Sequence, residues 1–322
     1  MKLAMIYSFL KQDLAVIEDA VNETIQSNNP VLREASSQLL NAGGKRIRPV
    51  FVLLAGKFGN YDIERMKSVA VSLELIHTAS LVHDDVIDEA EIRRGEETIK
   101  SRWDNRIAMY TGDYIFARSL ENLSALNDPK AHQILAETMV ELCLGEIEQI
   151  KDKYNIDQNV RSYLRRIKRK TAILIAASCR MGAIAAGVGL EEEKALYRYG
   201  YYVGMSYQII DDVLDFTASE KELGKPAGSD LIQGNITLPV LYSLEDHELK
   251  DELLQVFLKE KSTPGDFSWI IQRIKTNGSI DKSLELSDRY LKKAYEALEI
   301  LPQNRAKQTL KGIAKYIGKR RT

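Results

Sequence analysis

Hydrophobic and polar positions recur with the period of an α-helix along almost the whole chain. Segment 65–90 continues without glycine or proline, and segments 130–153, 191–217 and 282–300 repeat its pattern. Clusters of helix-breaking residues separate these segments, so the pattern predicts an all-α fold of about a dozen helices in a single domain, 1–322. The breakers are Asn28-Asn29-Pro30, Gly43-Gly44, Gly56–Asn60, Gly95, Asn127-Asp128-Pro129, Gly187–Gly189, Gly224–Gly228, Pro264-Gly265, Asn277-Gly278 and Pro302.

Two apolar segments raise the question of a membrane or an export signal. Within residues 1–20 the apolar pattern includes Lys11, Asp13, Glu18 and Asp19, which predicts an amphipathic helix rather than a secretory signal. Residues 172–190 are the strongest candidate for a membrane span, but Arg180 lies in their middle. Their glycines and alanines favour a buried helix that crosses a neighbour closely.

Composition and charge narrow the class of protein. The 322 residues include 45 Lys and Arg against 46 Asp and Glu, and 44% are hydrophobic. This balance excludes a disordered chain and argues against a nucleic-acid binder. Cys143 and Cys179 are too few for a disulfide framework, and we expect a cytoplasmic protein.

The most informative motif is Asp-Asp-x-x-Asp, which occurs twice within apolar sequence. Residues four apart on a helix share a face, so the first and last aspartates of each motif point the same way. Clustered carboxylates in apolar surroundings need cations, and oxygen-only ligands favour Mg²⁺ that borrows further ligands from a phosphorylated substrate. The first cluster is Asp84, Asp85 and Asp88, and the second is Asp211, Asp212 and Asp215.

Basic residues accompany both clusters, as a diphosphate substrate would require. Each run alone is usually a solvated helix face, but the runs together around two acidic clusters indicate anion binding. No Walker-type loop is present, and His77 and His83 lack zinc-site spacing. The basic segments are Gly43–Pro49, Arg93-Arg94-Gly95, Arg165–Thr171 and Gly224-Lys225-Pro226.

These motifs together resemble the trans-prenyltransferase, or polyprenyl diphosphate synthase, family along nearly the whole chain. The resemblance rests on Gly44–Pro49, Leu75–Asp88 running on to Arg93-Arg94-Gly95, Lys170-Thr171-Ala172, Gln208–Asp215 and Gly224-Lys225-Pro226 with Asp230. Within the family, overall likeness is greatest to the larger, catalytic component of bacterial two-component heptaprenyl diphosphate synthases.

The resemblance implies a helical bundle of the isoprenoid-synthase type around a central cavity, with the two acidic clusters facing each other at its mouth. It implies two or three Mg²⁺ ions, partly recruited with the substrate and held by both clusters. It also assigns the other polar residues. The allylic diphosphate would contact Arg93, Lys170, Thr171, Gln208 and Lys225, and isopentenyl diphosphate would contact Lys45, Arg48, His77 and Arg94.

The reaction implied is elongation of an allylic prenyl diphosphate by isopentenyl diphosphate. Ionisation of the allylic C–O bond places charge on the leaving diphosphate, which fixed cations stabilise. Ala79 and Ser80 are small and lie about one turn before the first cluster, and Ile76 and Ser72 lie further along the helix. We therefore expect a product longer than fifteen carbons, and the family resemblance favours thirty-five, for the menaquinone side chain.

Other functions remain open at this point. A geranylgeranyl or other medium-chain synthase would share these motifs, and a terpene cyclase usually replaces the second aspartate cluster. An all-α metal phosphohydrolase would leave Asp211–Asp215 unexplained. A non-catalytic scaffold subunit typically loses the metal and diphosphate positions, which are intact here.

We expect a small, catalytically incomplete partner subunit in a heterodimer, or a homodimer in isolation. The basic C-terminal segment is most simply a solvated helix end, and contact with anionic lipid at the membrane periphery is the alternative. Its cations are Arg305, Lys307, Lys311, Lys315, Lys319, Arg320 and Arg321.

Overall fold

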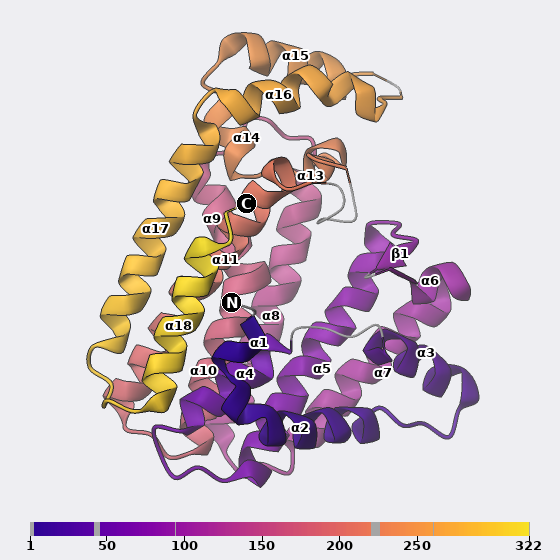
Figure 1. Ribbon diagram of the computed structural model, residues 1–322. Helices are drawn as coiled ribbons and strands as arrows, with labels where there is room; N and C mark the ends of the chain where they lie inside the picture. Colours follow the sequence, from indigo (N-terminus) through magenta and orange to yellow (C-terminus); the bar gives the residue numbers. More distant parts are fainter. Residues whose placement is uncertain (1–2, 42–45, 94, 220–225, 260, 322) are drawn as a thin grey trace. The chain divides into compact units, whose positions relative to one another are not determined.

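The computed structural model of the chain describes residues 3–41, 46–93, 95–219, 226–259 and 261–321, which are almost entirely helical (Figure 1). They divide into two compact units. Unit 1 comprises residues 1–139, 177–197 and 300–310, and unit 2 comprises residues 140–176, 198–299 and 311–322. The single domain 1–322 stays a prediction.

The elements of unit 1 come mainly from the first part of the chain. In order they are α1 (Leu3–Ile6), the 3-10 turn η1 (Ser8–Leu10), α2 (Lys11–Thr24), α3 (Pro30–Asn41), α4 (Ile47–Gly56), α5 (Ile63–Ile87), β1 (Ile92–Arg93), β2 (Glu96–Glu97), α6 (Ile99–Arg102) and α7 (Asn105–Leu123).

Unit 2 has several short helices and one long helix of its own. Its own elements are α9 (Val160–Ile167), the π-helical turn η2 (Lys168–Ala172), α13 (Ser229–Ile232), α14 (Leu238–Ser243), α15 (His247–Phe257), the 3-10 turn η3 (Pro264–Phe267), α16 (Ser268–Thr276) and α17 (Ser279–Leu298). Residues of both units belong to α8 (Pro129–Asp152), α10 (Ile173–Ala185), α11 (Leu190–Thr217) and α18 (Arg305–Lys319).

The four long periodic segments are confirmed as α5, α8, α11 and α17, with ends within about three residues of those expected. Predicted breakers separate helices where the structure describes them. Asn277-Gly278, for example, lies between α16 and α17, and Gly278 has a φ of 83° as the cap of α17. The all-α prediction is therefore confirmed, except for a two-stranded antiparallel hairpin in which Arg93 pairs with Glu96.

The N-terminal prediction is partly wrong. Residues 1–20 were expected as one amphipathic helix, but α1 ends at Ile6 and the turn η1 precedes α2. This turn places Tyr7 and Leu10 in the buried core, with only 7% and 0% of their surfaces exposed. The helix changes direction at this turn, but the spacing of hydrophobic residues along the sequence hardly changes. The pattern therefore does not reveal the turn.

The close helix crossing expected for residues 172–190 is confirmed. A Cβ added to Gly182 of α10 would lie 2.4 Å from the backbone oxygen of Val52 in α4, so only glycine fits. Arg180 is paired with Glu193 at 2.9 Å. No helix among the described residues is long and apolar enough to span a membrane. Cys143 and Cys179 are both free thiols.

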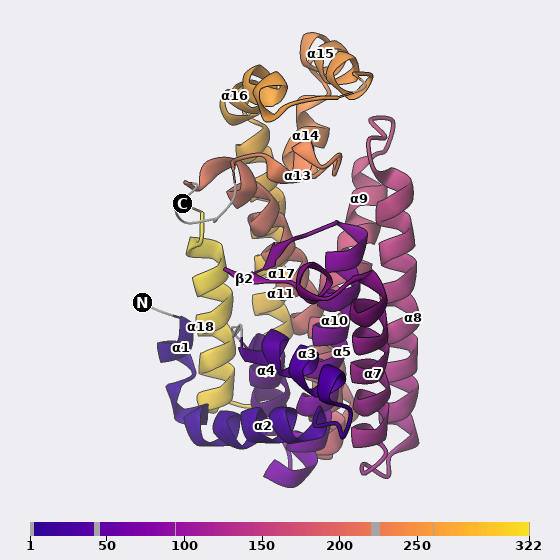
Figure 2. The same cartoon turned by 90° about the vertical axis from the view of Figure 1, so that its right-hand side faces the viewer.

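Packing of α5 against α7 forms the centre of unit 1, and the two helices lie side by side in both views (Figure 1, Figure 2). Gly112 of α7 allows this approach, because a Cβ there would lie 2.2 Å from Nε2 of His83 on α5. In unit 2, Met205, Ile209 and Phe216 of α11 belong to one buried hydrophobic cluster with residues of α14–α16. Each unit thus fixes one long helix, and each of these helices carries an acidic cluster.

Candidate active site

The first acidic cluster lies at the C-terminal end of α5. Asp88 caps this helix and its N–H donates to the backbone oxygen of Asp84 at 2.8 Å, which confirms that these two residues share a face. Asp85 is 2% exposed, and its Oδ1 accepts a hydrogen bond from Nε of Arg93 at 2.6 Å. Three carboxylates at the negative end of a helix dipole repel one another, so the arrangement favours bound cations.

Burial raises the pKa of Asp85, the ion pair with Arg93 opposes this rise, and the charges of Asp84 and Asp88 add to it. A cation placed against the cluster would offset the charge repulsion among these carboxylates. The electrostatics of the cluster therefore fit a divalent metal, as its oxygen donors do.

The chain turns sharply after the first cluster. Glu89 has a φ of 52°, an uncommon value for a residue other than glycine. The N–H of Ala90 donates to the oxygen of Asp85 at 2.9 Å, and that of Glu89 donates to Val86 at 3.4 Å, as in a Schellman C-cap. The turn directs the chain into the β1–β2 hairpin, and the hairpin brings Arg93 back onto Asp85.

The second acidic cluster lies near the C-terminal end of α11, and its three aspartates have different surroundings. Asp211 is exposed, and its Oδ1 lies 3.0 Å from Nη2 of Arg320. Asp215 is buried and accepts from Oγ of Ser229 at 3.1 Å and from the N–H of Asp230 at 3.2 Å. The most exposed carboxylate of this cluster, Asp211, is thus the one most accessible to a ligand.

Asp212 is the centre of a buried hydrogen-bond network. It accepts from the Tyr163 hydroxyl at 2.6 Å and from Nε2 of Gln208 at 2.8 Å, and Gln208 accepts from Thr171 at 2.7 Å. Burial raises the pKa of Asp212 to about 7, against the two hydrogen bonds that lower it, and the charge of Asp230 adds to the rise. The network connects Thr171 and Gln208, both predicted to bind diphosphate, to the second cluster.

Thr171 and Lys170 lie in the π-helical turn η2. Such turns are rare in proteins, and those that occur are often found at functional sites. Lys170 donates to Glu146 at 3.0 Å and to Gln149 at 3.1 Å, both on α8. A Cβ on Gly204 of α11 would lie 2.6 Å from Cα of Ala172, so α11 packs directly against the turn.

The residues predicted to bind isopentenyl diphosphate are described only in part. Arg48 lies in the first turn of α4, and His77 lies on α5, two turns before the first cluster. Both side chains are partly exposed. Lys45, Arg94 and Lys225 lie outside the described residues.

The predicted chain-length residues all lie on α5. Ala79 and Ile76 are fully buried, and the hydroxyl of Ser80 donates to the backbone oxygen of His77. Ser72 donates to the backbone oxygen of Ser119 in α7 at 2.9 Å, so its hydroxyl belongs to the α5–α7 packing. A wall for the growing product at Ala79 and Ile76 stays a prediction.

Within the described ranges, no group of three or more His, Cys, Asp or Glu side chains forms a ready-made metal centre.

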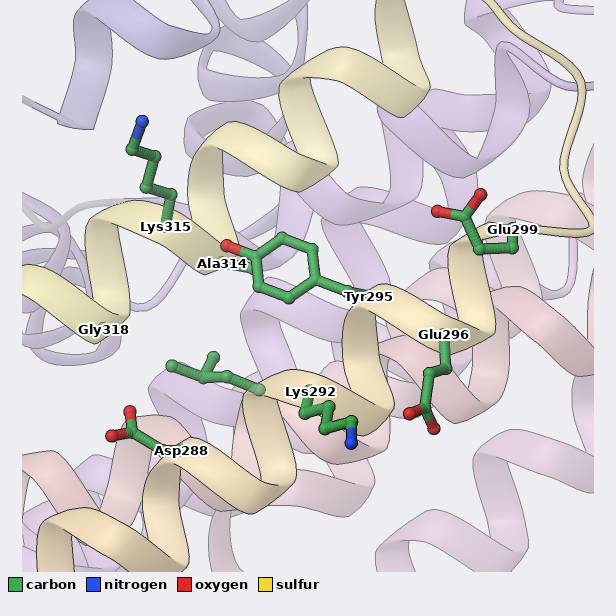
Figure 3. A pocket seen from close by; sticks show the side chains of 9 residues that line it. Asp288, Lys292, Tyr295, Glu296, Glu299, Ala314, Lys315 and Gly318 are labelled. Atoms are coloured by element: carbon green, nitrogen blue, oxygen red, sulfur yellow. The ribbon is translucent and has the colours of Figure 1, made fainter.

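A surface groove of about 520 Å³ lies between α17 and α18, and Tyr295 extends from α17 toward Ala314 of α18 (Figure 3). Its lining holds charges of both signs, such as Glu296 and Lys315, and none of the predicted site residues. It is therefore separate from the candidate active site.

Comparison with known proteins gives concordant results. Residues 29–274 match the family model described as polyprenyl synthetase. Over 321 residues the chain is 61% identical to heptaprenyl diphosphate synthase component 2 of Bacillus subtilis (strain 168), covering 100% of this chain and 92% of that protein.

Two solved structures show the same similarity. Heptaprenyl diphosphate synthase from Staphylococcus aureus superimposes with a TM-score of 0.92 at 44% identity, covering 97% of this chain and 99% of that one. A polyprenyl synthase from Caulobacter crescentus, crystallised with calcium and isoprenyl diphosphate, superimposes with a TM-score of 0.94 at 31% identity. The match covers 100% of this chain and 98% of that one.

Proposed function

The chain belongs to the polyprenyl synthetase family and is a prenyltransferase, and from this premise we propose that it is the catalytic component of a long-chain synthase making the thirty-five-carbon heptaprenyl diphosphate. The observation that carries the proposal is the pair of Asp-Asp-x-x-Asp clusters. Each lies at the C-terminal end of a long helix, with a buried central aspartate held by a donor from its own unit. The identity with heptaprenyl diphosphate synthase component 2 supports the product length.

Polyprenyl synthetases are generally Mg²⁺-dependent. We propose that Asp84, Asp88 and Asp211, the more accessible carboxylates of the two clusters, contact two or three Mg²⁺ ions directly. Asp85, Asp212 and Asp215 accept protein hydrogen bonds, and these bonds orient the backbone around the ligands. Bound Mg²⁺ supplies charge neutralisation on the diphosphate leaving group.

The chain's own cations then act on the substrates. Arg93, Lys170 and Lys225 bind the allylic diphosphate with Thr171 and Gln208, and they stabilise the charge that develops when its C–O bond breaks. Lys45, Arg48, His77 and Arg94 orient isopentenyl diphosphate. Its double bond attacks the allylic carbon, a new C–C bond forms, and loss of a proton restores an allylic product ready for another addition.

The contacts of Lys170 support its assignment. Its ammonium group is held by Glu146 and Gln149 on α8, and the π-helical turn fixes its backbone. A cation held by two partners loses little entropy on binding, so it is preorganised for a diphosphate. The same argument applies to Arg93, which Asp85 holds.

We propose that a second, smaller component binds the exposed apolar stripe of α8, because the B. subtilis relative is named as one component of its enzyme. Val140, Leu144 and Ile147 follow helical spacing on one face and are 59%, 42% and 52% exposed. A contiguous apolar stripe on a helix is typical of a protein interface.

The basic C-terminal helix gives little support to membrane contact. Lys307 is 1% exposed and donates to the oxygen of Leu301, Lys311 pairs with Glu299, and Arg320 pairs with Asp211. Among its described cations, Arg305, Lys315 and Lys319 are exposed. We propose a cytoplasmic enzyme.

The test is incubation with Mg²⁺, isopentenyl diphosphate and farnesyl diphosphate, with and without a candidate small component. We expect thirty-five-carbon products that disappear with EDTA. Products that stop at twenty carbons would identify a medium-chain synthase, and no prenyl transfer in any combination would contradict the proposal.

A further inference from the structure

Arg46 joins three helices of unit 1 beside the predicted isopentenyl diphosphate site. Its Nε and Nη2 donate to the two carboxylate oxygens of Glu18 on α2, at 2.8 and 2.7 Å. Its Nη1 donates to Oε1 of Glu74 on α5 at 3.0 Å. A planar guanidinium makes such a two-sided contact, and the point charge of a lysine does not.

The backbone of Arg46 is also unusual. It is the N-cap of α4 and adopts a left-handed conformation, with φ 44° and ψ 37°. A residue other than glycine is uncommon in this region and keeps such a conformation only when surrounding contacts hold it. The three side-chain hydrogen bonds are such contacts, so they determine where α4 begins.

The start of α4 determines the position of Arg48. Arg48 lies two residues after Arg46, in the first turn of the helix, and Pro49 follows it within the buried part. On the other side of the clamp, Glu74 lies three residues before His77 on α5, so the two are neighbours along the helix surface. Arg46 therefore links the turn that carries Arg48 to the helix that carries His77.

We propose that Arg46 is a positioning residue for the isopentenyl diphosphate subsite: through Glu18 and Glu74 it fixes Arg48 relative to His77, without itself contacting the substrate. This inference rests on the proposed function for the identity of the ligand. The contacts of Arg46 are with protein carboxylates, which already occupy all three of its donor nitrogens named above.

The charges at the clamp suit a permanent structural contact. Glu74 is 4% exposed, and Arg46 supplies the opposite charge that a buried carboxylate needs. Burial alone would lower the pKa of Arg46, but the hydrogen bonds to Glu18 and the charge of Glu74 outweigh it and raise that pKa. These contacts therefore favour the charged form of the guanidinium.

The experiment measures binding and kinetics in three variants. Arg46→Met removes the clamp, Arg46→Lys keeps only the charge, and Arg46→Met with Glu74→Gln removes the clamp without leaving a buried carboxylate unpaired. For the last two, we expect the KM for isopentenyl diphosphate to rise about 10-fold, with the KM for farnesyl diphosphate unchanged and kcat within about twofold. The dissociation constant of isopentenyl diphosphate, measured by calorimetry, should rise in parallel.

Lys57→Met is the matched control. Lys57 caps the opposite end of α4 and pairs with Asp13 of α2 at 3.3 Å, so its loss weakens the same helix pair away from Arg48. We expect its KM for isopentenyl diphosphate to equal that of the wild type. Glu74→Gln alone keeps an oxygen that accepts from Arg46, so its KM for isopentenyl diphosphate should be close to that of the wild type.

The outcomes separate the inference from the proposed function. If the wild type condenses the two substrates but the Arg46 variants keep its KM and dissociation constant, the positioning role is wrong and the proposed function stands. An equal rise in the KM for isopentenyl diphosphate in Lys57→Met would also overturn the inference, because general loosening of α4 would then explain the effect. If the wild type neither binds nor uses isopentenyl diphosphate, both fail together.

Discussion

Arg320 Nη2 lies 3.0 Å from Asp211 Oδ1, so a residue near the C-terminus pairs with the most exposed carboxylate of the second acidic cluster. Arg320 also lies over the ring of Tyr207, 5.3 Å from its centroid. A metal ion that binds Asp211 must compete with this guanidinium. We therefore expect the C-terminal segment to influence the metal requirement of the enzyme.

We predict that Arg320→Gln lowers the Mg²⁺ concentration needed for half-maximal activity about twofold to fivefold, the range expected for a partly exposed ion pair. The measurement is a Mg²⁺ titration at saturating substrates. Arg321→Gln is the control, because Arg321 pairs with Asp288 and not with the cluster. An unchanged or increased Mg²⁺ requirement in Arg320→Gln would contradict competition at Asp211.

The raised pKa of Asp212 predicts a pH-dependent stability. The carboxyl has a pKa of about 7 in the folded protein against 3.8 in the unfolded chain, so without metal the folded state retains this proton to a higher pH. The contribution of Asp212 to stability is therefore complete below about pH 4 and is lost as the pH rises through 7. Integrated over that shift, the loss approaches about 4 kcal/mol.

Urea unfolding of the metal-free protein tests this. Between pH 5 and pH 8 the free energy of unfolding of the wild type should fall relative to that of Asp212→Asn, which mimics the protonated carboxyl. Equal pH dependence in the two proteins would show that burial does not hold a proton on Asp212.

The sequence predicted the parts of the fold that depend on local periodicity. α5, α8, α11 and α17 have one apolar pattern from end to end, and a glycine or proline lies within four residues of the start of each, so their positions could be found without tertiary information. The spacing within each acidic cluster follows from helix geometry in the same way.

The remaining features depend on contacts between residues distant in the sequence. The β1–β2 strands have two residues each, too short for an alternating pattern, and Glu89 turns the chain without the glycine that usually marks a C-cap. The π-helical turn at Lys168–Ala172 contains no glycine or proline that would indicate a departure from the α-helix. The pairings of Arg320 with Asp211 and of Arg46 with Glu18 and Glu74 join basic residues that the sequence suggested were solvated or substrate-binding.

Substitutions along α5 test the proposed wall for the product. Ala79→Phe should shorten the products most, because the ring would block the proposed path of the growing product near the first cluster. Ile76 lies about 4.5 Å further along the axis, so Ile76→Phe should stop the chain at a greater length. Chromatography of the dephosphorylated products measures both. Folded variants that keep the wild-type product lengths would show that these side chains serve only helix packing.

The apolar stripe of α8 predicts a contact with the second component. Leu144→Asp together with Ile147→Asp should abolish co-elution of the two components on size-exclusion chromatography, because two charges would be buried without partners. Leu258→Asp is the control, since Leu258 lies outside α8 and is an apolar side chain that is 81% exposed. Unchanged co-elution of the α8 variant would place the interface elsewhere.

The central claim is that both acidic clusters hold metal against one diphosphate, and metal counting tests it most directly. Mn²⁺ binding is measured by electron paramagnetic resonance, with and without a farnesyl thiodiphosphate that cannot ionise. We predict that the analogue creates tight Mn²⁺ sites in the wild type, and that Asp84→Asn or Asp211→Asn alone abolishes most of them. Full analogue-dependent Mn²⁺ binding in either single variant would show that the two clusters do not share a ligand.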